Sequence, residues 1–259
     1  MFLLVTVEAQ CQTIQNPEIL LQRIRDRMAA HLSQLPNYTC HQVVDRLMRR
    51  ASSVSFERLD RLDLEVALVG NRELFSRAGE ARFQEQEIHN IVPAGTIGNG
   101  AFGSYVETVL SGGGAAIRYI GQSKTDGHKT FRYDFDVPQA KSNFLVRHGT
   151  AQGIVGYKGS FWADADTLDL VRVELKADRI PANIGVSVVE ESMHYKIIRI
   201  GKSDFLLPRK SQLSSSDQSG NYSLNMIILE HCREFSGESV VTFGGLAQGA
   251  SADREAPQR

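Results

Sequence analysis

The chain has 259 residues, of which 42% are hydrophobic and 23% charged, with a formal net charge of -1 and a pI of about 6.7. This length fits one large β domain or two small ones with a substantial core. A charge this close to zero gives no electrostatic basis for a nucleic-acid partner. The clustered arginines Arg46, Arg49 and Arg50 fit solvated positions near a strand end.

The N-terminus indicates export. Residues 2–7 form a short apolar run, and Val7-Glu8-Ala9 resembles a small-residue cleavage signal. The run is too short to cross a bilayer, which needs about 20 apolar residues, and no later segment could cross one. We therefore interpret residues 1–15 as a truncated secretory signal or a disordered start, and expect a periplasmic or exported protein. Lipidation at Cys11 is the alternative, although Gln10 stands where lipoprotein signals have a small residue.

The first predicted element is a helix that begins at Asn16 and runs to about Gln34. Asn16 is a good cap, Pro17 suits the first turn, and Glu18 lies near the positive end of the helix dipole. Apolar residues recur every four positions and form one face that must pack on another element: Leu20, Ile24, Met28 and Leu32.

Alternating apolar residues predict mainly strands after this helix. We expect a strand from Tyr38 to about Met48, then a hairpin of 62–68 and 73–77. Two short helical segments follow between Phe83 and Leu110, separated by a glycine-rich loop. Strands resume at 115–121, 129–137, 143–148, 153–163, 168–177, 185–200, 203–214 and 222–243, the last of which is either one strand or two. The tail 244–259 is predicted to be disordered.

The hairpin from Tyr157 to Asp178 gives the clearest pattern. Its two strands flank a tight acidic turn, Asp164-Ala165-Asp166-Thr167. On the first strand, Val155, Tyr157, Gly159, Phe161 and Ala163 share one face. On the second, alternation places Leu168, Leu170, Arg172 and Glu174 opposite Asp169, Val171, Val173 and Leu175.

These elements do not alternate as βαβ units, which excludes doubly wound folds and parallel barrels. We expect a mainly β (α+β) fold in which a strongly curved antiparallel sheet of about eleven strands forms a half-barrel. The N-terminal helix and the short helical insertion would cover it, as a single domain over residues 16–243. Its interior is either packed solid or left as an apolar ligand cavity, and this choice decides the function.

Cys40 and Cys232 each have a histidine neighbour, His41 and His231, which suggests a zinc site. Adjacent residues on a strand point to opposite faces, so neither pair could easily hold one ion. A disulfide between Cys40 and Cys232 is the better hypothesis, with two buried free thiols as the alternative. It would close a loop of about 190 residues, worth on the order of 4 to 5 kcal/mol.

Other motifs do not support catalysis. Gly98, Gly100 and Gly103 match a dinucleotide-binding pattern without a βαβ context, and Gly201-Lys202-Ser203 lacks the upstream glycine of a phosphate loop. The aspartates near 164–169 do not fit a calcium loop and favour turn chemistry. We assign no catalytic residue, cofactor or metal ligand, although a hidden triad stays open. The histidines show no HExxH pair: His31, His41, His89, His128, His148, His194 and His231.

The segments Gly159-Ser160-Phe161-Trp162-Ala163-Asp164 and Thr167-Leu168-Asp169-Leu170-Val171-Arg172-Val173-Glu174 carry a resemblance. Together with the order of elements, they look like the lipoprotein-carrier fold of LolA, LolB and the periplasmic sensor RseB. The likeness covers residues 16–243 as topology. The segments Leu35-Pro36-Asn37-Tyr38-Thr39-Cys40 and Cys232-Arg233-Glu234-Phe235-Ser236-Gly237-Glu238-Ser239 look more closely like a group of exported bacterial proteins with matching cysteines.

The resemblance implies an apolar cavity able to hold acyl chains, and a sixteen-carbon chain could contribute roughly 10 kcal/mol before ordering costs. We therefore expect a non-enzymatic envelope protein that binds lipid or the acyl chains of a lipoprotein. One alternative is a sensor or interaction module that binds another envelope protein, and another is a small-substrate enzyme on the same fold. An apolar concavity, an exposed apolar patch or convergent polar groups would distinguish the three.

Overall fold

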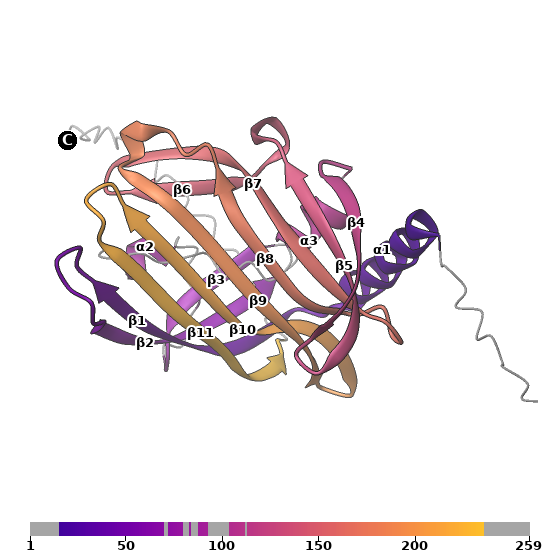
Figure 1. Cartoon of the computed structure of the whole chain (residues 1–259). Coiled ribbons are helices and arrows are strands. Elements are labelled where there is room, and N and C mark those ends of the chain that lie inside the picture. Colours follow the sequence, from indigo (N-terminus) through magenta and orange to yellow (C-terminus); the bar gives the residue numbers. More distant parts are fainter. Residues whose placement is uncertain are drawn as a thin grey trace, which may run out of the picture.

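The computed structural model describes residues 16–69, 72–79, 83, 88–92, 104–111 and 113–235. The predicted signal, the glycine-rich loop and the predicted C-terminal tail lie outside these residues. Eleven strands form one antiparallel sheet in the order β3-β2-β1-β11-β10-β9-β8-β7-β5-β4, and β6 pairs with β7 off this path (Figure 1). The helices lie on one face of the sheet, which we call the helix-side face; the other is the opposite face.

The helical elements are α1 (Pro17–Gln34), α2 (Ile88–Ile91), α3 (Ser104–Val106), the π-helix η1 (Glu107–Ser111) and the 3-10 turns η2 (Gln139–Lys141) and η3 (Ala182–Ile184). The strands are β1 (Tyr38–Arg49), β2 (Glu57–Val69), β3 (Arg72–Arg77), β4 (Ala116–Thr125), β5 (His128–Val137), β6 (Phe144–His148), β7 (Ala151–Asp164), β8 (Leu170–Asp178), β9 (Val186–Ile200), β10 (Ser203–Asp217) and β11 (Tyr222–Glu234). No described helix is both long enough and apolar enough to cross a bilayer.

The predicted mainly β fold is confirmed, with an N-terminal helix and eleven antiparallel strands. The predicted strong curvature is wrong, because the sheet is not strongly curled. The edge strands β3 and β4 do not pair with each other, so the twist accumulates across the sheet without closing it (Figure 1). The strand β2 begins earlier than predicted because its pairing with β1 continues to Glu57.

The helix α1 forms where the sequence predicts it. The Asn16 side chain accepts a hydrogen bond from the Glu18 backbone N–H at 2.9 Å, and Pro17 occupies the first turn. Leu20, Ile24 and Met28 are buried against the sheet. The helix ends at Gln34, after which Leu35 adopts an extended conformation before the chain enters β1.

The turn between β7 and β8 fastens α1 to the sheet. Asp164 accepts hydrogen bonds from the backbone N–H groups of Asp166 and Thr167 at 2.9 and 3.0 Å, which confirms the predicted turn chemistry. Asp169 accepts hydrogen bonds from Arg27 and His31 of α1 at 2.6 and 2.7 Å. Burial acts to raise the pKa of Asp169, yet these hydrogen bonds hold it below its ordinary value.

A β-bulge changes the faces of the β7–β8 hairpin. The register shifts between Trp162 and Ala163, so Trp162 pairs with Arg172 and Ala163 with Leu170. Leu170 is therefore buried in the helix-side core, and its predicted placement on the face of Arg172 is wrong. Trp162 lies on the opposite face, where the guanidinium of Arg132 is 5.3 Å from its ring centroid and that of Arg172 is 5.7 Å away.

Candidate functional site

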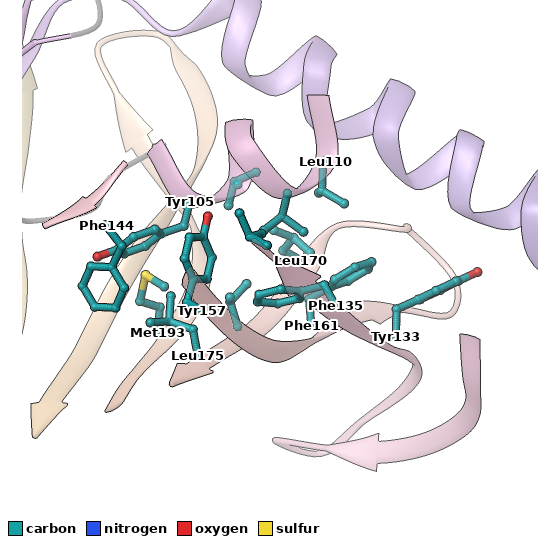
Figure 2. Close-up of a cluster of buried hydrophobic side chains, with 14 of the residues drawn as sticks. Tyr105, Leu110, Tyr133, Phe135, Phe144, Tyr157, Phe161, Leu170, Leu175 and Met193 are labelled. Carbon is teal, nitrogen blue, oxygen red and sulfur yellow. The ribbon is translucent and has the colours of Figure 1, made fainter. Parts of the chain in front are cut away.

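The helix-side face between β5 and β9 carries the larger of two apolar clusters, which we call the first cluster (Figure 2). The elements α1, α3 and η1 cover it. We refer to α3 and η1 together as the cover, which is three plus five residues long. Four side chains of the cover are buried: Tyr105, Val106, Val109 and Leu110.

Aromatic rings form the centre of the first cluster. The Tyr105 ring of the cover meets the rings of Phe144 and Tyr157 edge-on, at centroid distances of 5.6 and 5.7 Å. Farther along the face, Tyr133 and Phe161 stack at 5.1 Å. Figure 2 shows these rings in a row beneath the helical segment that carries Leu110. Such pairs contribute about 0.5 to 1.5 kcal/mol each beyond their burial. The packed rings and the aliphatic side chains of the sheet around them form an apolar surface beneath the cover, which we call the floor.

A glycine makes room for one of these rings. Gly159 lies opposite Phe135 in the register of β5 and β7. A Cβ at this position would lie 2.6 Å from the Phe135 ring and would collide with the carbonyl oxygen of Glu174. The absence of a side chain at Gly159 therefore lets Phe135 pack against the strand.

A carboxyl group is buried in this apolar floor. Glu191 lies on β9 between Val189 and Met193, and its exposed fraction is 7%. Burial raises the pKa of Glu191 to about 7, and the hydrogen bond from the Tyr105 hydroxyl acts in the opposite direction. Burial and the nearby Glu191 likewise raise the pKa of Tyr195. The first cluster thus contains a buried carboxyl group near a hydroxyl group of the cover.

Glu191 has no cation beside it in its row of the sheet. In the strand registers it is followed across the helix-side face by Leu213, Asn225 and Arg46. Arg46 is three strand spacings away, roughly 14 Å, and makes an ion pair with Asp60. The Tyr105 hydroxyl of the cover is therefore the polar group that acts against the raised pKa of Glu191.

The second cluster covers the other half of the helix-side face and is built mainly from β1, β2 and β11 with α2. Ile88 and Val92 at α2 pack with Phe75 of β3 in this cluster. The structure joins Cys40 of β1 and Cys232 of β11 by a disulfide, the pairing that the sequence predicts. A covalent bond thus links neighbouring strands within the second cluster, next to buried Tyr38 and Val66.

The opposite face has a different chemistry. An open cleft of about 650 Å³ runs across β7 to β11 on this face. Charged side chains line one side of it, including the ion pairs Lys176–Glu190, at 2.8 Å, and Arg172–Glu174. The other side of the cleft is apolar and is formed by three side chains of β11: Tyr222, Met226 and Ile228. Of these, Met226 is 49% exposed.

Most of the histidines considered in the sequence make separate contacts with carboxylates. Within the described part of the chain, no three His, Cys, Asp or Glu side chains are grouped so that they could hold a metal ion. The side chain of His89 is not among those that the structure describes. The pairs are His31–Asp169, His41–Asp63, His128–Asp164 and His194–Asp126.

Sequence reasoning missed Glu191 and Tyr105 as partners. The signal for Glu191 was present, because it occupies an inward position of an alternating strand between Val189 and Met193. A charged residue at such a position predicts a buried polar contact. Its partner could not be found, because Tyr105 lies 86 positions earlier in the chain, in a helical segment whose docking site is not encoded locally.

No protein-family model matches the chain, and no curated protein matches it in sequence. Similar solved structures include a domain described as that of an outer membrane lipoprotein-sorting protein from Vibrio parahaemolyticus, 12% identical, covering 87% of this chain and 96% of that chain, with a TM-score of 0.45. A LolA superfamily protein from Nitrosomonas europaea is 9% identical, with coverages of 83% and 94% and a TM-score of 0.36. MucB in its Pseudomonas aeruginosa complex with MucA is 11% identical, with coverages of 84% and 99% and a TM-score of 0.26.

At these identities and TM-scores, the function must be inferred from the residues of this chain itself.

Proposed function

We propose that the chain is a non-enzymatic envelope protein that binds an acyl chain, of a lipid or of a lipidated partner, in the first cluster beneath the cover. The observation that supports this is the continuous aromatic and aliphatic floor under α3 and η1 (Figure 2). Such a floor holds an acyl chain by burial alone and needs no catalytic residue.

In the structure, side chains of the cover occupy the floor, so an acyl chain has to displace them. Four buried side chains, each worth about 1.5 to 3 kcal/mol, hold the cover down. A sixteen-carbon chain gains roughly 10 kcal/mol on burial, which is of the same size. The exchange is therefore close to balanced. A cover of two short helical segments, one of them a π-helix, suits such an exchange because short helices have little stability of their own.

The disulfide supports an exported location for this activity. Structural disulfides persist in oxidising compartments such as the periplasm and are rare in the cytosol. The bond between Cys40 and Cys232 joins positions 192 residues apart, so it constrains most of the described chain. A periplasmic or otherwise exported protein is the setting that fits it.

Native mass spectrometry tests the proposal on protein purified from a periplasm without detergent and then mixed with palmitoylglycerol. We expect a one-to-one adduct, and we expect Leu110→Ala to increase its fraction because the weakened cover competes less well. Val92→Ala is the matched control, since Val92 is equally buried but belongs to the second cluster. Absence of any adduct, or an adduct that Leu110→Ala reduces while Val92→Ala does not, would contradict the proposal.

A second candidate function is a protein-interaction module that uses the opposite face. The open cleft with its exposed Met226 favours it, because exposed apolar side chains within a charged rim are typical of protein contacts. A photo-crosslinker at Met226, in cells that make the protein, tests it. A discrete crosslinked species that is absent with the crosslinker at exposed Leu145 would favour this function.

A further inference from the structure

Within the first cluster, the carboxyl group of Glu191 is a polar group that the polar end of a bound acyl chain would meet. The side chain of Glu191 is 7% exposed and lies in the floor, on the face of β9 that carries Val189 and Met193, and the nearby hydroxyl of Tyr105 in the cover acts to lower its pKa. A ligand that lifts the cover removes this donor. A buried carboxyl group without a hydrogen bond is unfavourable, so a ligand that displaces the Tyr105 hydroxyl must bring a donor of its own.

We infer that the site selects acyl chains whose polar end is a hydrogen-bond donor, such as a hydroxyl, amide or amine, over chains that end in a carboxylate, and that Glu191 sets this selectivity. The inference rests on the proposed function. A donor group takes the place of the Tyr105 hydroxyl, whereas a carboxylate brings a second acceptor and a second negative charge.

The groups that face Glu191 from the surrounding elements agree with this selectivity. Tyr105 of the cover and Tyr195 of β9 are phenols, and burial and the negative charge of Glu191 raise the pKa of both. The charge of Glu73 on β3 also raises the pKa of Tyr105. The neighbours in the register of β8 and β10 are Leu175 and Leu213, and Arg46 in the same row is paired with Asp60. No cation among these groups would balance an incoming carboxylate.

Selectivity of this kind is set by unmet hydrogen bonds. A site built to bond a polar group discriminates strongly against an analogue that leaves its own buried groups unpaired, whereas pure apolar burial discriminates weakly. The aromatic floor therefore provides the affinity for an acyl chain, and Glu191 provides the selectivity for its polar end.

Equilibrium dialysis of the full chain with hexadecanol, hexadecanamide and palmitate, each below its solubility limit, tests the inference. At about pH 8, where both palmitate and Glu191 are mainly ionised, we expect the alcohol and the amide to bind at least about tenfold more tightly than palmitate. Glu191→Gln should reduce this preference to less than about threefold, since the glutamine amide can donate to a carboxylate. Glu190→Gln is the matched control, because the neighbouring Glu190 points to the opposite face and pairs with Lys176.

The outcomes are distinct. If no ligand binds, the proposed function fails and the inference fails with it. If all three bind with similar affinity, or if Glu191→Gln leaves the preference unchanged, an acyl site exists but Glu191 does not select its ligand. A second readout needs no variant: hexadecylamine should bind more tightly as the pH rises from about 5 to about 8, because Glu191 becomes charged. An amine affinity that does not change with pH would also overturn the inference.

Discussion

The two apolar clusters share one face of one sheet but are held in different ways. The second cluster contains a disulfide between β1 and β11, and its strands pair over most of their length. The first cluster has no such bond among its described residues, and four buried side chains hold its cover on the sheet. The comparison teaches that one sheet can hold its two halves by different means: the opening that we propose for the cover would break no strand pair, whereas the second cluster is built on paired strands joined by a disulfide.

The largest predicted effect concerns the second cluster. Replacing Cys40 and Cys232 together with serine should lower the free energy of unfolding by on the order of 4 to 5 kcal/mol, because the unfolded chain loses a very long closed loop. Urea unfolding of the variant and of the oxidised wild type measures it. Reduction of the wild type should reproduce the loss, and acyl-chain uptake should persist below the transition. A loss under about 1 kcal/mol would show that the disulfide does not hold the second cluster.

The next effect concerns the first cluster. The folded-state pKa of Glu191, about 7, exceeds its ordinary value of 4.5, so the folded state binds this proton more tightly than the unfolded state. Its stability contribution is full below about pH 4.5 and is lost as the pH rises through about 7, by on the order of 3 kcal/mol. Urea unfolding across this window should show the decline in the wild type and a much smaller one in Glu191→Gln. An equal decline in both proteins would remove Glu191 as its cause.

A tight contact in the floor gives a smaller effect. Gly159→Ala should lower the free energy of unfolding by about 1 to 3 kcal/mol, because the new methyl group overlaps the Phe135 ring and the Glu174 carbonyl. Gly153→Ala on the same strand is the control. Its Cβ would meet only the tip of the Ile184 side chain, at 3.3 Å, and it should cost less than about 1 kcal/mol. Equal losses in the two variants would mean that Phe135 does not limit the packing.

The attachment of α1 gives the smallest effect. Asp169→Asn should destabilise the fold by about 1 to 2 kcal/mol, because the partners Arg27 and His31 lose their carboxylate and the site is partly open to solvent. The lowered pKa of Asp169 means that its contribution is present above about pH 4 and is lost as the pH falls further. Thermal unfolding of Asp169→Asn beside the exposed Asp166→Asn measures it. If the two variants melt together, the turn does not fasten the helix.

Local patterns predicted the elements of the fold well. The cap at Asn16, the alternation along β7 and the acidic turn at Asp164 are encoded within a few residues of each position, and the structure has them where predicted. Errors arose where tertiary pairing overrides local pattern. The bulge beside Trp162 moved Leu170 to the other face. The part of the last predicted strand beyond residue 235 lies outside the described residues.

The candidate site was less predictable than the fold. Whether the helix-side interior is filled depends on how the cover docks, and no short stretch of sequence encodes that contact. The Tyr105–Glu191 pair joins residues far apart in the chain, so only the sheet registers and the packing of α3 reveal it. The cysteine pairing was accessible from sequence because few residues compete for it: the chain has three cysteines in all.

The central claim is that the cover opens over a fixed sheet, and hydrogen exchange with and without palmitoylglycerol tests it most directly. We predict that backbone amides of residues 104–111 exchange much faster than those of β1 and β11, and that the ligand changes exchange at the cover and at the β7 to β9 floor but not in the second cluster. Protection of the cover equal to that of β11, with no change on adding the ligand, would contradict the account.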